Sequence, residues 1–240
     1  MLAPKRLARI AGLLYLIVAI FGGFAQFGVR MQVYVAGDAA ATAENVVANA
    51  GLVRVGVVAD LLQATVFLFL AMTLYLLLHE ASRNAARAMV ILVAIATTMM
   101  CLVVLFQFAA LLVATDPSYV TAFGTAGSSA LVLLLLDLQH YGFLIAQIFF
   151  GLWLVPLGYL AFRSGSFPRA LSVLLVVGGV CYLADMLVLF LVPEIGARIN
   201  DVIVIPSTIA ELWMIGYLLL RGVRSPRRAV IAPTMAPATA

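Results

Sequence analysis

Charged residues are scarce in this chain, and their scarcity indicates its class. Only 10% of the 240 residues are Asp, Glu, Lys or Arg, 65% are hydrophobic, and the mean hydropathy is +1.18. A soluble domain carries about 25% charged and about 45–50% apolar residues. No stretch is long and polar enough to form a separate soluble domain. We therefore expect a helix bundle whose outer surface faces the lipid bilayer.

Cysteine and histidine are also scarce, which excludes several kinds of site. The two cysteines, Cys101 and Cys181, lie in apolar runs, so they predict packing residues and no disulfide framework. The two histidines, His79 and His140, are expected at opposite membrane surfaces, where they cannot share a metal ion or a haem. We predict no cofactor and no metal. Basic residues flank the apolar runs and form no patch, which argues against nucleic acid as a partner.

Six apolar segments are each long enough to cross a hydrocarbon core of about 30 Å. They cover residues 10–29, 55–78, 88–113, 137–162, 170–192 and 202–220. The sequence therefore predicts an all-α integral membrane protein, a six-transmembrane-helix bundle that forms one domain over residues 1–228. Charged or turn-rich breaks separate the segments, including 193–201. The tail, 229–240, is short and rich in Ala and Pro, and we expect it to be disordered.

The placement of Lys and Arg predicts the orientation of the bundle. If the amino terminus is cytoplasmic, eleven basic residues lie inside and only Arg30, Arg54 and Arg198 lie outside. We therefore expect both termini in the cytoplasm and the protein in the inner (plasma) membrane.

Two connections predicted on the outer side are longer than a simple turn. In the first, Asp38 can cap a short helix and Gly51 can end it, while Val46 and Val47 give it an apolar side. This predicts an amphipathic helix on the membrane surface. The apolar run 130–162 that follows the second connection is about 50 Å long as one helix, so it projects outward or breaks near Gly142.

Several segments carry a family resemblance. They are RIAGLLYLIVAIFGGFAQF at 9–27, GDAAATAENV at 37–46, VRVGVVADLL at 53–62, LDLQHYGFLIAQIFFGLWLVPLGYLAFRSGSFPRALSVLLVVGGVCYL at 136–183 and IAELWMIGYLLLRGVR at 209–224. In this order the chain, apart from its tail, resembles an uncharacterised bacterial family of membrane proteins, domain of unknown function 4386. The resemblance implies a multi-pass membrane protein and brings no activity and no site residue with it.

Four carboxylates lie within or at the edge of the predicted spans, at Asp60, Asp137, Asp185 and Glu211. An acidic group in a bilayer costs about 2.5–3.5 kcal/mol on insertion scales. Glu211 is ten residues from Arg221, about 15 Å along a helix, which places it near the midplane. A midplane Glu predicts a functional group, or else a protonated structural one, and the hydroxyls one turn earlier, on Ser207 and Thr208, are candidate donors.

Polar side chains recur in the outer half or near the centre of every predicted span. The candidate ligand-binding residues are Gln26, Arg54, Asp60, Gln63, Gln107, Gln147, Asp185 and Glu211. Their depth predicts a pocket that is open to the outside and closed toward the cytoplasm. The alternative is a set of separate hydrogen bonds that join pairs of helices. Arg54 cannot reach Asp60 within one helix, so if it neutralises a carboxylate, that carboxylate lies on another helix, with Asp137 and Asp185 as the candidates.

Asp137 and His140 are three residues apart and share a helix face. This spacing predicts a proton-exchanging pair at the mouth of the pocket, because an Asp one turn away favours the charged form of His. A surface pair at the lipid–water boundary fits the spacing equally well.

Three functions remain open. The first is binding or transport of a small polar or cationic solute, with proton or cation coupling, and the small chain would then favour a homodimer. The second is an accessory protein that senses pH or a partner without turnover. The third is an intramembrane enzyme that acts on a lipid, which the absence of a G-x-S-x-G motif makes the weakest of the three.

Overall fold

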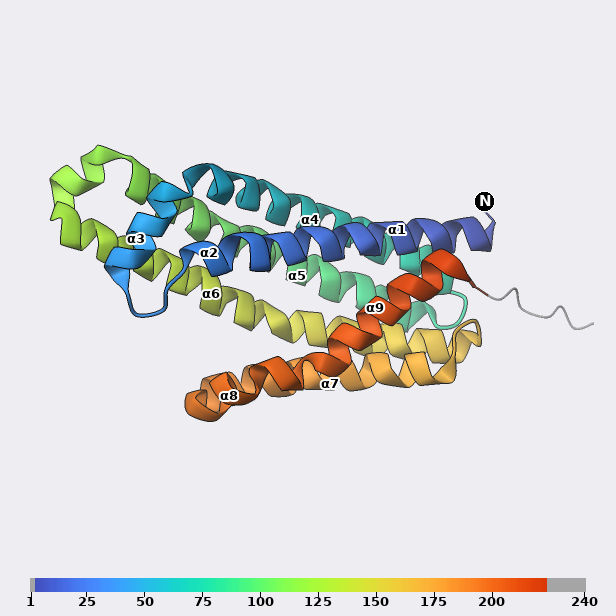
Figure 1. Ribbon diagram of the computed structural model, residues 1–240. Coiled ribbons are helices and arrows are strands. Elements are labelled where there is room, and N and C mark those ends of the chain that lie inside the picture. Colours follow the sequence, from blue (N-terminus) through green and yellow to red (C-terminus); the bar gives the residue numbers. More distant parts are fainter. Residues whose placement is uncertain (1–2, 224–240) are drawn as a thin grey trace, which may run out of the picture.

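The computed structural model describes residues 3–223, and every regular element in that range is a helix (Figure 1). The elements are α1 (Pro4–Gly23), the π-helical η1 (Phe24–Arg30), α2 (Met31–Val33), α3 (Ala39–Ala48), α4 (Ala50–Leu78), α5 (Arg83–Thr115), α6 (Pro117–Ser164), α7 (Arg169–Leu191), α8 (Pro193–Ile203) and α9 (Ile205–Leu220). The all-α class is confirmed, with six stretches long and apolar enough to span a membrane. The tail, 229–240, lies outside the described residues.

The spanning helices form a ring around a common interior. Each of α1, α4, α5, α6, α7 and α9 packs on the next in that order, and α9 returns to α1. Away from the amino-terminal end the ring is incomplete, because η1 contacts α1, α2 and α4 while α8 contacts α7 and α9. Within residues 3–223, no contact joins η1 to α7, α8 or α9.

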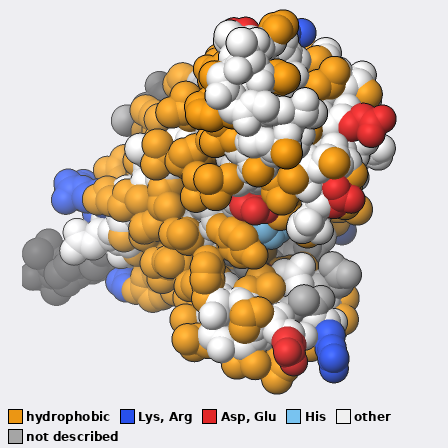
Figure 2. All heavy atoms as spheres, turned by 90° about the vertical axis from the view of Figure 1, so that its left-hand side faces the viewer, with side chains coloured by type: hydrophobic (Ala, Val, Ile, Leu, Met, Phe, Trp, Pro, Cys, Tyr) orange, Lys and Arg blue, Asp and Glu red, His pale blue; other side chains and the backbone are white. Residues whose placement is uncertain are grey.

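One end of the bundle carries most of the basic residues. It holds the start of α1, the α4–α5 and α6–α7 turns and the end of α9 (Figure 1). The basic residues of these segments are Lys5, Arg6, Arg9, Arg83, Arg87, Arg163, Arg169 and Arg221. The opposite end is mostly hydrophobic, with acidic side chains at separate places (Figure 2).

Helix α6 shows that the long apolar run projects and does not break near Gly142. Its one non-helical residue is Gly124, at φ +72° and ψ 166°. The forty residues that follow reach about 60 Å, twice the thickness of a hydrocarbon core. Gly142 serves packing instead, since a Cβ there would lie 2.5 Å from Cγ1 of Val103 on α5.

The predicted break at 193–201 is helical, because these residues belong to α8 (Pro193–Ile203), and it separates the fifth and sixth spans only from Leu191 to Arg198. Pro193 occupies the first turn of α8, where a missing backbone N–H removes no helical hydrogen bond. The sixth spanning stretch is therefore longer than predicted, Arg198–Leu220, with an interruption at Val204 between α8 and α9.

The helix expected in the first long connection is present as α3. Asp38 caps it as predicted, and its carboxylate accepts the Ala41 N–H at 2.9 Å. The helix ends at Ala48 and not at Gly51, which belongs to α4. Val46 is buried, because α3 packs on α5 and α6, while Val47 is exposed. The apolar side of α3 is thus partly covered by protein.

Helices α6 and α7 cross at a pair of glycines, which gives a stability prediction. A Cβ on Gly179 would lie 2.6 Å from the carbonyl oxygen of Gly151. We expect Gly179→Ala to lower the free energy of unfolding by about 1–3 kcal/mol, because the added carbon forces the helices apart. Thermal unfolding in detergent measures this. Gly216→Ala, which has open space around it, is the matched control, and equal midpoints for the two variants would contradict the close crossing.

Candidate functional site

Glu211, on α9, faces a cavity of about 170 Å³ inside the ring of helices. Two tyrosine hydroxyls hold its carboxylate from other helices. Tyr15 on α1 donates to Oε2 at 2.8 Å, and Tyr182 on α7 donates to Oε1 at 3.2 Å. The carboxylate is thus fixed between α1 and α7 while one side of it remains open to the cavity.

The expected donors to Glu211, Ser207 and Thr208, are engaged elsewhere. Both hydroxyls donate to the carbonyl oxygen of Val204, at 3.1 Å each. The reason is local, since Ser and Thr on a helix readily return their hydroxyl to a carbonyl three or four residues back.

The cavity wall is mainly aromatic. Five helices contribute side chains to it: α1, α4, α6, α7 and α9. The lining residues are Tyr15, Val18, Gln63, Phe67, Phe143, Gln147, Phe150, Trp153, Tyr182 and Glu211. Within the described part of the chain, Glu211 is the one carboxylate in this wall, and no basic side chain lines it.

Arg30, and not Arg54, is the arginine that pairs with an intramembrane carboxylate, and that carboxylate is Asp60. The Arg30 Nη2 atom lies 2.8 Å from Oδ1 and 2.7 Å from Oδ2 of Asp60. Arg30 ends the π-helical turn η1 and Asp60 is on α4, so the pair joins the first two spans. Arg54 is exposed and forms no ion pair within residues 3–223, which corrects the expectation that it neutralises Asp137 or Asp185.

Asp185 is buried and held by amides. Gln147 Nε2 donates to its Oδ2 at 2.6 Å, and Asn200 Nδ2 lies 2.9 Å from both carboxylate oxygens. Three helices, α6, α7 and α8, therefore meet at this one carboxylate. Gln147 also lines the Glu211 cavity, so Asp185 lies directly behind the cavity wall.

Asp137 and His140 are linked through Tyr34 instead of to each other. The Tyr34 hydroxyl donates to Oδ1 of Asp137 at 2.6 Å, and its ring stacks on that of His140 with centroids 5.5 Å apart. No hydrogen bond or ion pair joins Asp137 to His140 in the described residues. Burial, and then the bond to Asp137, raises the pKa of the Tyr34 phenol well above its usual range, so it remains a donor.

The other glutamine candidates are divided among different surroundings. Gln63 lines the cavity and packs against Gly22, whereas Gln26 is exposed. Gln107 is buried beside Gly56, and its Oε1 atom has no hydrogen-bond partner in the described structure. Of the eight predicted ligand-binding residues, the cavity thus gathers Gln63, Gln147 and Glu211.

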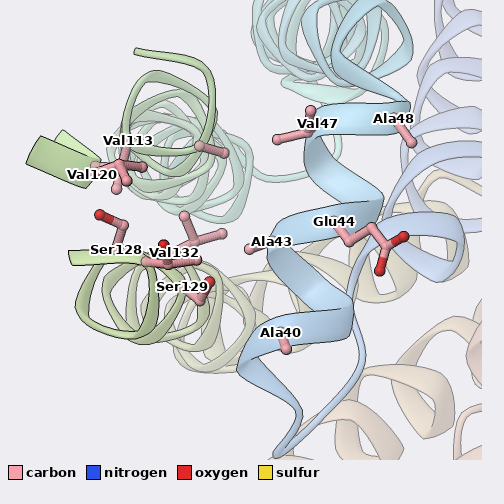
Figure 3. A pocket seen from close by; sticks show the side chains of 12 residues that line it. Ala40, Ala43, Glu44, Val47, Ala48, Val113, Val120, Ser128, Ser129 and Val132 are labelled. Atoms are coloured by element: carbon pink, nitrogen blue, oxygen red, sulfur yellow. The ribbon is translucent and has the colours of Figure 1, made fainter. Parts of the chain in front are cut away.

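A larger pocket, of about 460 Å³, lies between α3, α5 and α6. Figure 3 shows that alanine and valine side chains form most of it and that the Glu44 carboxylate points away from it. It offers little beyond apolar contact and the Ser128 and Ser129 hydroxyls. We therefore take the Glu211 cavity as the candidate site.

Four residues central to this arrangement were not among the predicted site residues: Tyr15, Arg30, Tyr182 and Asn200. Arg30 had a recognisable signal, because the apolar run around it continues to Val33 and places it at the edge of a span. Asn200 could not be found, because it lies in a segment predicted to be a turn. Tyr15 and Tyr182 show no pattern that distinguishes them from tyrosines that only pack.

The fold defines a multi-pass helical membrane protein, with a largely aromatic cavity that contains one carboxylate, Glu211. Over residues 10–222 the chain matches the family described as domain of unknown function DUF4386, and it belongs to that family. The resemblance seen in the sequence is thereby confirmed. No curated protein and no solved structure matches the chain.

The ion pair predicts a large loss of stability for one arginine substitution and almost none for another. Arg30→Met leaves Asp60 buried without its partner and is expected to lower the free energy of unfolding by about 3–5 kcal/mol. Replacing both residues, as Arg30→Met with Asp60→Leu, should restore much of this loss. Arg54→Met is the control and should change stability by less than about 0.5 kcal/mol. Thermal unfolding in detergent decides, and a loss for Arg54→Met equal to that for Arg30→Met would refute the assignment.

Proposed function

We propose that this protein binds a small polar or cationic solute at the Glu211 cavity, as a step in moving that solute across the membrane. One observation carries the proposal. Glu211 is only half-buried, and it lines a cavity to which no basic side chain of the described residues contributes. Intramembrane carboxylates with an accessible side commonly mark solute or ion pathways.

The other buried carboxylates support this choice by contrast. Asp60 has Arg30 as a partner, and Asp185 has two amide side chains. Each is nearly inaccessible, and each joins two or three helices. Their contacts satisfy them within the protein, whereas Glu211 has only two tyrosine hydroxyls and retains room for a ligand.

We propose that the solute reaches the cavity from the outer side. The basic end of the bundle belongs in the cytoplasm by the positive-inside rule, with both termini, in the plasma membrane. Arg30 is paired inside the bundle, so the other basic residues of the opposite end are Arg54, on α4, and Arg198, on α8. That end is also where η1 and α8 do not contact each other, which leaves the ring incomplete toward the outside.

The irregular helices near the cavity fit a transport role. A π-helical turn, η1, continues α1 beyond Tyr15, and the α8–α9 interruption at Val204 precedes Glu211 by seven residues. Interrupted helices beside an intramembrane site recur in transporters, because their ends can move relative to the rest of the bundle.

The proposal predicts a solute-binding defect for Glu211→Gln. Purified protein is screened with small cationic, neutral and anionic solutes, and a binding solute should raise the thermal unfolding midpoint. Glu211→Gln keeps the shape of the side chain but removes its charge. The apparent affinity derived from the midpoint shift should therefore be at least tenfold weaker in this variant. Glu44→Gln, on the exposed face of α3, is the matched control.

Reconstituted vesicles extend the test to transport. The solute identified by binding should enter vesicles that contain the protein, and Glu211→Gln should abolish that flux. If no solute of any charge class gives a Glu211-dependent shift, the binding role is wrong. Binding without flux would leave a sensor as the function.

A further inference from the structure

The aromatic residues of the Glu211 cavity form one continuous wall. Trp153 packs edge to face against Tyr15 and Phe67, with ring centroids 5.7 and 5.0 Å away. Phe150 then contacts Phe67 at 6.3 Å and Phe143 at 5.3 Å. These rings come from α1, α4 and α6, and Glu211, on α9, lines the same cavity and accepts the Tyr15 hydroxyl.

From this wall we infer that the solute is an organic ammonium ion. The inference rests on the proposed binding role of the same cavity and names the chemistry of its ligand. Aromatic faces carry a negative quadrupole and attract cations within about 6 Å of the ring centroid. A carboxylate beside such faces complements an ammonium group, while the surrounding carbon surface complements its alkyl substituents.

One ring of the wall already contacts a cation of the protein, although that cation does not line the cavity. The guanidinium carbon of Arg30 lies 5.2 Å from the centroid of the Phe143 ring, and Phe143 also lines the cavity. The Arg30 charge is matched by Asp60, so it does not neutralise Glu211. The cavity lining therefore contains one carboxylate without a basic partner and several aromatic residues.

Other ligand classes fit this lining less well. Divalent metal ions such as Ca²⁺ and Mg²⁺ take six or more oxygen ligands, and residues 3–223 hold no group of three or more His, Cys, Asp or Glu that could bind a metal. An anion would meet Glu211 and no basic side chain. A sugar needs many hydrogen-bonding groups, whereas the amides here are Gln63 and Gln147, the latter already bound to Asp185.

The volume of the cavity limits the size of the ligand. An engineered cavity of about 150 Å³ in another protein holds one benzene molecule, so a site of 170 Å³ suits a solute of roughly five to ten non-hydrogen atoms. Tetramethylammonium and choline lie in this range. The neutral analogue 3,3-dimethylbutan-1-ol has the shape of choline with carbon in place of the charged nitrogen.

The chain offers its own reporter for the test. It has two tryptophans, of which Trp153 lines the cavity and Trp213 is exposed. In a Trp213→Phe variant, the emission of Trp153 reports ligand entry directly. We expect saturable changes with choline and tetramethylammonium, and an apparent affinity for 3,3-dimethylbutan-1-ol at least tenfold weaker.

Ring substitutions test the aromatic contribution separately. Phe150→Leu, with Phe67→Leu as a second variant, should weaken choline binding by about three- to thirtyfold and change binding of the neutral analogue little. The ammonium inference would be overturned by equal affinity for choline and its analogue. It would also be overturned if another solute binds and neither ammonium ion does. Either result would leave the proposed binding role intact. Absence of binding by every solute class would refute that role as well.

Discussion

A carboxylate inside a lipid-solvated bundle needs hydrogen-bond donors or a cation from the same chain, because neither lipid nor bulk water supplies them. This constraint determines how the helices of this protein are joined. Asp60 ties α4 to η1 through Arg30, and Asp185 ties α7 to α6 and α8 through Gln147 and Asn200. The association of helices in lipid lacks the hydrophobic driving force found in water, so such polar ties and close glycine contacts carry more of the specificity.

Glu211 meets the same constraint in a different way. Two tyrosine hydroxyls satisfy part of its carboxylate, and the remainder faces a cavity walled by aromatic rings. A carboxylate that serves only stability is expected to be enclosed by its partners, as Asp185 is enclosed by Gln147 and Asn200. The contact of Glu211 with a cavity is the observation on which the proposed binding role of this DUF4386 protein rests.

The sequence predicts the class of fold well and the polar contacts poorly, for physical reasons. Hydropathy over about twenty residues is a strong signal, so the six spans and the cap at Asp38 could be located in advance. Residues 193–201 contain Pro193 and three charged side chains, which indicate a turn, yet tertiary contact with α7 makes them helical. Composition alone could not predict that outcome.

Counting residues from Arg221 predicts a depth for Glu211 but cannot assign its partners. Depth follows from one-dimensional counting along a helix, whereas partners depend on how each helix is rotated about its axis and on its neighbours. Tyr182 shares a helix face with Asp185 in sequence, yet its hydroxyl donates to Glu211. Arg54 and Arg30 carry the same charge and are both predicted on the outer side, yet Arg30, at the end of the π-helical turn η1, is the one that pairs with Asp60.

The account divides the buried carboxylates into those that hold the bundle together and one that serves a ligand. The most direct test compares the unfolding free energies of Asp60→Asn and Glu211→Gln without any solute present. Asp60→Asn should be destabilised by about 3–5 kcal/mol, because Arg30 loses its counter-charge, while Glu211→Gln should stay within about 1 kcal/mol of the unmodified protein. A loss for Glu211→Gln as large as that for Asp60→Asn would show that Glu211 is structural and would contradict the account.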